Sequence, residues 1–194
     1  MTINLMDKEG HGIAPDAFIS GMSRNQETFL GWYNAFSWTN PEDEAYFAAG
    51  FGRGLRCAII AADWCGDVAR NVPVVLRVME KAQIPTEVFI MEENLDLIDQ
   101  FLTFGGRSIP VVLLLDNDGN VLGKWGPRPI YVQEPMVEFK THHQDKDHPG
   151  YQDKMRETYA EIHKRYGEGT GYQTLIVAEL KDLIASISSP PVSK

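Results

Sequence analysis

The spacing of apolar residues along the chain changes near residue 55, from a helical pattern to a strand pattern. Before this point, four apolar side chains recur at helical spacing and predict a helix that covers a core: Phe29, Leu30, Tyr33 and Phe36. A second short helix is predicted to begin after Asn40, which is a favoured N-cap residue, with Pro41 in the first helical position. This helix is expected to end near Gly50.

From residue 55 onward, short apolar runs alternate with helical patterns. Strands are predicted at 57–62, 86–91, 110–115 and 120–124, and helices at 66–82 and from Asn94 to Gly105. The polar run 116–119, Asp-Asn-Asp-Gly, separates the last two strands and is typical of a hairpin turn. Alternation followed by an antiparallel pair predicts an α/β fold, in which helices cover a mixed central sheet.

Two further helical stripes lie near the end of the chain, and both are expected to pack on the sheet. The first stripe ends at Gly167 and contains Met155, Tyr159, Ile162 and Tyr166. The second ends at residues 188–191 and contains Ile176, Leu180, Leu183, Ile184 and Ile187. Between residues 130 and 150 the pattern is weaker.

Composition limits the class of protein. The chain has 194 residues, of which 43% are hydrophobic, and a formal net charge of −9. The apolar content excludes a disordered chain, and the negative charge argues against a nucleic-acid partner. No apolar run reaches the roughly 18–20 residues that span a bilayer, and residues 1–12 lack the pattern of a secretory signal. We therefore expect a soluble cytoplasmic protein, and we predict neither a cofactor nor a metal.

The segment with the clearest chemical signal surrounds Cys65. A predicted strand ends, the chain turns, and this cysteine appears where the helix 66–82 begins. Unpaired N–H groups and the helix dipole favour an anion at such a position, so the pKa of Cys65 is expected to be lowered. Trp64 is expected to shield one side of the sulfur, and Pro73 is expected to kink the helix.

Several short motifs include this cysteine or follow it along the chain: Asp63-Trp64-Cys65-Gly66-Asp67, Arg70-Asn71-Val72-Pro73, Ser108-Ile109-Pro110, the hairpin 116–119 and Trp125-Gly126-Pro127-Arg128-Pro129. Together they resemble the thioredoxin superfamily, and in particular a bacterial branch that has extra helices at both ends. The resemblance implies a thioredoxin-like core at 53–128, an N-terminal helical extension at 1–52 and a C-terminal one at 129–194, in a single domain. It also implies a cis peptide bond before Pro110, with this proline beside Cys65.

The sequence departs from the family at the position of the second thiol. A dithiol oxidoreductase of this class uses Cys-x-x-Cys, and here Val68 occupies the second position. Cys57 cannot replace that thiol, because five residues of strand separate it from Cys65 by roughly 16 Å, whereas a disulfide requires Cα atoms within about 7 Å. We expect Cys57 to be a small buried side chain. Ile59 stands where the family has a buried carboxylate.

These observations leave two hypotheses, and a third, a redox sensor in which Cys65 is glutathionylated or joins a partner covalently, shares its chemistry with the first. In the first, Cys65 forms mixed disulfides with protein or peptide partners, and an external thiol such as glutathione resolves them. An extended peptide would lie in a groove at the helix start, with Trp64 and Pro110 as walls, the Ile109 backbone as hydrogen-bond partner, and Gly66 and Asp67 beside the sulfur. In the second, the same groove belongs to a redox-inactive binding module.

Several charged residues have more than one interpretation. Asp67 could cap the helix, or its carboxylate could raise the pKa of Cys65, and Arg70 could offset that charge. Arg107 could attract an acidic ligand or simply face water. The segment from His142 to His148 has three histidines and two aspartates, but its spacing matches no established metal site.

Overall fold

The computed structural model describes residues 3–51, 54–143 and 145–188 and confirms a mixed central sheet. The strands are β1 (Arg56–Ala61), β2 (Thr86–Ile90), β3 (Val111–Leu115) and β4 (Val121–Trp125), in the order β2-β1-β3-β4. β2 pairs parallel with β1, whereas β3 pairs antiparallel with both β1 and β4. This arrangement confirms the predicted α/β architecture with a mixed central sheet, and helical extensions are present at both ends.

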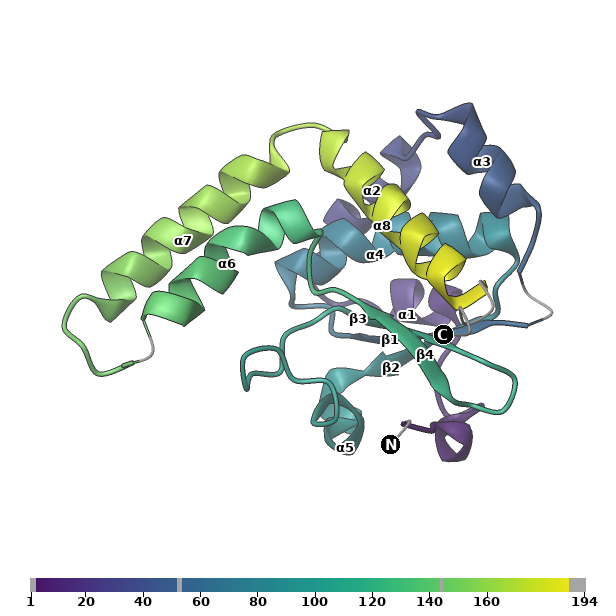
Figure 1. Ribbon diagram of the computed structural model, residues 1–194, viewed down its shortest axis with the longest axis horizontal. Coiled ribbons are helices and arrows are strands. Elements are labelled where there is room, and N and C mark those ends of the chain that lie inside the picture. Colours follow the sequence, from purple (N-terminus) through teal and green to yellow (C-terminus); the bar gives the residue numbers. More distant parts are fainter. Residues whose placement is uncertain (1–2, 52–53, 144, 189–194) are drawn as a thin grey trace, which may run out of the picture.

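The helix that follows β1 has the predicted bounds. It is α4 (Gly66–Ala82), and Pro73 lies inside it with its side chain buried. In Figure 1, α4 runs along one face of the sheet together with α2 (Gln26–Ala35) and α8 (Gly171–Ser188), while α5 (Leu95–Ile98) lies on the other side. Because β1 is almost entirely buried beneath α4, the turn between them is held on a rigid support.

The helix predicted from Asn94 to Gly105 is shorter than expected. It ends at Ile98, and the chain then forms an isolated bridge between Thr103 and Gly106. Phe104 and Gly105 close that bridge with positive φ angles of 51° and 72°, which a right-handed helix cannot contain. The turn therefore replaces the last helical turns that the pattern suggested.

The N-terminal extension consists of the short 3₁₀ helix η1 (Met6–Lys8), α1 (Pro15–Gly21), α2 and α3 (Pro41–Ala48). Asn40 is the N-cap of α3, as predicted, since its side-chain oxygen accepts a hydrogen bond of 2.9 Å from the N–H of Glu42. Between η1 and α1, Ile13 forms an antiparallel bridge with Val88 at the edge of the sheet. The extension is thus joined to the sheet by backbone hydrogen bonds.

The C-terminal extension contains one helix that the sequence pattern did not reveal. This is α6 (Ile130–His142), which includes Pro135 and was hidden by its mixed polar and apolar pattern. It pairs with α7 (Tyr151–Tyr166), and in Figure 1 the two helices project away from the sheet as a hairpin. The expectation that both terminal helices pack on the sheet is therefore wrong for α7 and correct for α8, which packs on β4 and α4.

The predicted end of the helix before Gly167 can be compared directly with the structure. Gly167 follows α7 with a φ of 69° and donates hydrogen bonds to the carbonyls of His163 and Lys164, as expected of a C-terminal glycine. The predicted end of α8 at 188–191 extends beyond the described residues, as does the boundary predicted at 52–53. No helix within the described ranges combines the length and apolar character required to span a membrane.

Candidate functional site

Cys65 lies at the junction of β1 and α4, as predicted. It is the N-cap residue of α4 and is partly buried against the core. Its thiol lies 3.5 Å from the carbonyl oxygen of Ile109, to which it donates a hydrogen bond. This contact brings the cysteine next to Pro110, and the Ile109–Pro110 peptide bond is cis, as the resemblance implied.

The expected lowering of the Cys65 pKa is wrong. Burial raises the pKa of this thiol, and the Asp67 carboxylate raises it further. The backbone amides of Val68 and Asp67 and the Arg128 guanidinium act in the opposite direction but do not reverse the shift. The hydrogen bond to Ile109 also favours the protonated thiol. The amides at the start of α4 lower the pKa of Cys65, as predicted, but burial of the sulfur away from water raises that pKa by more.

Alkylation of Cys65 is therefore expected to reach half of its maximal rate above the free-cysteine value of about pH 8.5. The thiolate is the reactive form, so a raised pKa leaves less of it at neutral pH. Rates of iodoacetamide reaction between pH 6 and 10, followed by mass spectrometry, measure this shift. The Cys65→Ser variant is the control, since only Cys57 then remains. A midpoint below pH 8 would contradict the raised pKa.

Asp67 is the centre of a mostly buried polar network. Its two carboxylate oxygens accept hydrogen bonds of 2.9 and 2.6 Å from Arg128 and one of 2.9 Å from the hydroxyl of Tyr166. The side chains of Arg128 and Asp67 are only 10% and 17% exposed. The fully buried Asn71 donates to Tyr166 and to the carbonyl of Pro127. The carboxylate thus links the first turn of α4 to the loop after β4 and the end of α7, rather than capping the helix.

Arg70 does not offset the charge beside Cys65. Its guanidinium lies between the rings of Trp32, Tyr166 and Tyr172, at 4.7–4.8 Å from each centroid, and donates to the carbonyl of Gly167. This position ties α4 to α2, α7 and α8. Arg128, rather than Arg70, pairs with Asp67 and offsets the charge of its carboxylate.

Arg107 forms an ion pair with Asp99. Two hydrogen bonds of 2.6 and 2.8 Å join the guanidinium to the carboxylate, and both side chains are more than 40% exposed. A solvated surface pair explains this arginine without a ligand.

Trp64 and Asp63 connect the motif to other parts of the chain. The Trp64 side chain is 46% exposed, and its indole N–H donates to Glu92. The Asp63 carboxylate accepts hydrogen bonds from the backbone N–H groups of Ser23 and Arg24, in the loop between α1 and α2. The N–H of Ser23 is the main cause of the lowered pKa of Asp63. The N-terminal extension is therefore fixed beside the cysteine.

The remaining predicted site residues differ in their surroundings. Gly66 is exposed, and open space lies where a Cβ would be. Val68, which occupies the position of the second thiol, is fully buried, and the side chains of Ile109 and Pro110 are also buried. The backbone carbonyl of Ile109, rather than its side chain, therefore forms the hydrogen bond with Cys65.

The loop after β4 contacts the segment at Pro110. The Gly126–Pro127 bond is also cis, which the sequence did not predict, and Gly126 has a φ of 108°. A Cβ at Gly126 would lie 2.3 Å from the carbonyl oxygen of Pro110, so only glycine fits. This close approach places Arg128 where it can reach Asp67.

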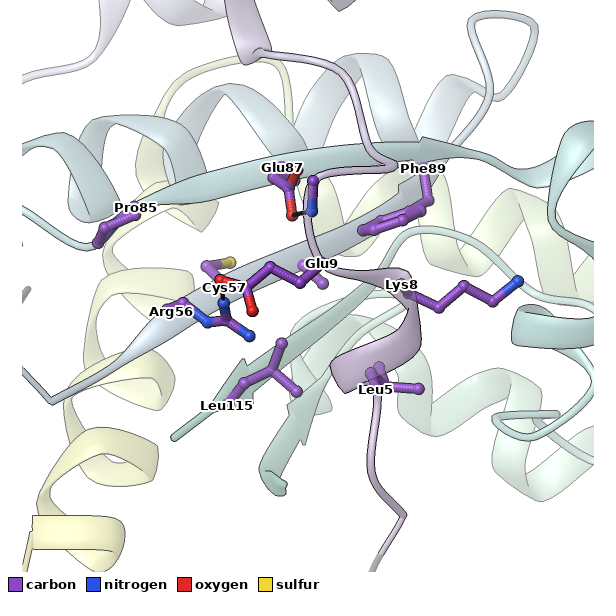
Figure 2. Close-up of a pocket in the computed structure, with 11 residues that line it drawn as sticks. Leu5, Lys8, Glu9, Arg56, Cys57, Pro85, Glu87, Phe89 and Leu115 are labelled. Carbon is purple, nitrogen blue, oxygen red and sulfur yellow. Dashed lines mark hydrogen bonds and ion pairs between the residues drawn. The ribbon is translucent and has the colours of Figure 1, made fainter. Parts of the chain in front are cut away.

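Cys57 is separate from this site, as predicted. It is 2% exposed, both cysteines are free, and burial raises the pKa of Cys57 to about 12. Figure 2 shows it in the wall of a pocket of about 220 Å³, where Arg56 pairs with Glu9. Of the described residues that line this pocket, none belongs to the predicted site. At neutral pH the Cys57 thiol is therefore protonated and is a poor nucleophile.

The histidine-containing segment does not form a recognisable ligand cluster within the described ranges. Among those residues, no group of three or more His, Cys, Asp or Glu side chains is arranged to hold a metal. His142 is the last residue of α6, and the ring of His148 accepts a hydrogen bond from the N–H of Gly150. Residue 144 of this segment lies outside the described residues.

Arg128, Asn71 and Tyr166 are the site residues whose roles the sequence did not reveal. One local signal was available, because Asn71 lies four residues after Asp67 and so shares a helix face with the buried residues Val74 and Val78. A buried amide on such a face requires polar partners. Their identity depends on long-range packing that spacing does not encode.

Comparison with known proteins agrees with this geometry. A family model described as thioredoxin matches residues 12–147, a wider interval than the motifs alone suggested. A protein of unknown function from Pseudomonas aeruginosa has a similar crystal structure, with a TM-score of 0.62, 16% identity, and coverage of 91% of this chain and 94% of that one. An HIV epitope-scaffold has a TM-score of 0.61 and 18% identity, with coverage of 90% and 93%.

At these identities the two structures support the fold alone. A sequence comparison with curated proteins gives no significant match. The family model, by contrast, covers more than half of the chain and includes both Cys65 and Pro110. The chain therefore belongs to the thioredoxin family.

Proposed function

We propose that this protein exchanges disulfides through the single thiol of Cys65. The observation that carries the proposal is the position of this sulfur, at the start of α4 and 3.5 Å from the carbonyl that precedes the cis Pro110. It is only partly buried, whereas the second cysteine is enclosed. The thiolate of Cys65 is favoured by the amides of Asp67 and Val68 and by the guanidinium of Arg128. These groups support a nucleophilic role for Cys65, although burial reduces its reactivity.

The exchange has two balanced steps. The Cys65 thiolate attacks one sulfur of a mixed disulfide between a polypeptide and glutathione, which forms a Cys65–glutathione disulfide and releases the polypeptide thiolate. A second glutathione thiolate then attacks that bond, which releases oxidised glutathione and restores the Cys65 thiolate. Val68 occupies the place of the resolving thiol, so the external glutathione is essential.

Turnover of a glutathionylated peptide by the full chain with glutathione, glutathione reductase and NADPH tests this proposal. We expect a rate that increases between pH 7 and 9, because more thiolate forms as the pH approaches the raised pKa. Cys65→Ser is expected to abolish the rate, and the matched variant Cys57→Ser is expected to retain it. Insulin reduction, which requires two thiols, should remain near background. Equal rates for the Cys65→Ser variant and the parent chain would refute the proposal.

A redox-inactive binding module is the second candidate, and the raised pKa of Cys65 favours it. In that case the surface beside Cys65 and Pro110 holds a polypeptide without covalent chemistry. The two functions differ in one measurement: a binding module retains its affinity for a partner in the Cys65→Ser variant and shows no glutathione-dependent turnover in the parent chain.

A further inference from the structure

A second recess lies beside Trp64, and the N-terminal extension forms part of its wall. It has a volume of about 480 Å³, within the range of pockets that bind ligands, and we name it the Trp64 pocket. Its walls come from α1 and the residue that bridges to β2, from the turn that precedes Cys65, and from the segment after β2. Trp64 is adjacent to Cys65 in the chain, so a polypeptide held at the sulfur can reach this pocket within a few residues.

The floor and walls of the Trp64 pocket are largely apolar. Phe18, Met22 and Ile90 line it together with Trp64 and Ile13, and the last two side chains are 46% and 38% exposed. Large apolar side chains that border one recess on a protein surface often mark a site of interaction. The lining suits a large apolar side chain of a partner, and the volume leaves room for a residue beside it.

The rim of the Trp64 pocket is acidic. Asp63, Glu92 and Glu93 contribute carboxylates, and no lysine or arginine occurs among the described residues that line it. Asp63 is held ionised by the N–H groups of Ser23 and Arg24, and Glu92 accepts from the indole of Trp64. Glu93 is exposed at the rim. A cationic side chain next to the apolar one would find complementary charge there.

We propose that the Trp64 pocket binds a large apolar side chain of a polypeptide partner that carries a lysine or arginine beside it. The inference rests on the proposed function in one respect, because it names the partner class of the same site. Free glutathione does not match the pocket, since this tripeptide has no large apolar side chain and is negatively charged at neutral pH. The pocket thus selects the polypeptide half of a mixed disulfide.

Binding of labelled peptides to the full-length Cys65→Ser variant tests the pocket without any thiol chemistry. The probe is a fluorescein-labelled nine-residue peptide with a central serine, phenylalanine three residues to each side, and lysine next to each phenylalanine. Fluorescence anisotropy gives its affinity. Changing phenylalanine to serine, or lysine to glutamate, is expected to weaken binding about tenfold or more. Equal affinity for the three peptides would refute the proposed specificity of the pocket, and the comparison needs no protein variant other than Cys65→Ser.

Charge reversal at the rim provides the protein-side test. Glu93→Lys is expected to weaken binding of the lysine peptide and to strengthen binding of the glutamate peptide. The matched control is Glu157→Lys, an exposed position on α7. Ile13→Ser is expected to weaken both peptides, with Leu122→Ser on β4 as its control. Equal responses in the pocket variants and their controls would overturn the assignment.

The two proposals can fail separately. If the parent chain turns over glutathionylated substrates but the Cys65→Ser variant shows no preference among the peptides, the pocket is wrong and the exchange stands. If the peptides bind with the expected order but turnover is absent, the pocket stands and the chain is a binding module.

Discussion

Replacing Arg128 by Met is expected to lower the free energy of unfolding by about 3 kcal/mol and to slow alkylation of Cys65. The guanidinium makes two hydrogen bonds to Asp67 and one of 2.7 Å to Gln133, and its loss leaves a mostly buried carboxylate without its counter-charge. The same guanidinium lowers the pKa of Cys65, so its removal raises that pKa. Urea denaturation and iodoacetamide rates at pH 7.5 measure the two effects.

The Asp67→Asn variant is the matched comparison, because it should change stability in the same direction and reactivity in the opposite one. Removing the carboxylate leaves Arg128 buried without its partner, which lowers the free energy of unfolding. It also removes a charge that raises the pKa of Cys65, so alkylation should become faster. A pKa change of half a unit alters the thiolate fraction about threefold at neutral pH. If both variants change the rate in the same direction, the electrostatic account of Cys65 is wrong.

The double variant separates charge from packing. With Asp67→Asn and Arg128→Met combined, neither charge is left unpaired, so the loss of stability should be smaller than the sum of the two single losses. The hydroxyl of Tyr166 can still donate to the asparagine oxygen. Additive losses would show that the interaction between Asp67 and Arg128 contributes little to the free energy of unfolding.

The sequence predicted the elements whose causes are local. The bounds of α4 follow from a strand, a turn and a sustained apolar stripe, and the N-cap of α3 follows from Asn40 itself. The separation of Cys57 from Cys65 follows from strand geometry. The cis bond at Pro110, in contrast, could be expected only because the motifs resemble a known family.

The properties that the sequence did not predict depend on residues that are distant along the chain. The field of the α4 N-terminus is local, but the burial of Cys65 and its contact with Ile109 depend on the packing of a segment more than forty positions away. Arg128 reaches Asp67 from a loop whose path is set by Gly126. The sign of the Cys65 pKa shift was therefore wrong because the local contribution was visible and the opposing one was not.

Replacing Gly126 by Ala is expected to destabilise the protein by about 3 kcal/mol or more, through its contact with Pro110. The φ of 108° disfavours any side chain, and the new Cβ would lie 2.3 Å from a backbone oxygen that cannot rotate away. Either the loop after β4 or the segment at Pro110 must move, and the second movement would displace the carbonyl that contacts Cys65. Gly31→Ala is the matched control: this exposed glycine lies inside α2 with open space around it, so alanine should stabilise by about 0.5–1 kcal/mol. Urea denaturation followed by circular dichroism compares the two variants. A loss below about 1 kcal/mol for Gly126→Ala would mean that the loop yields easily and does not fix the position of Pro110.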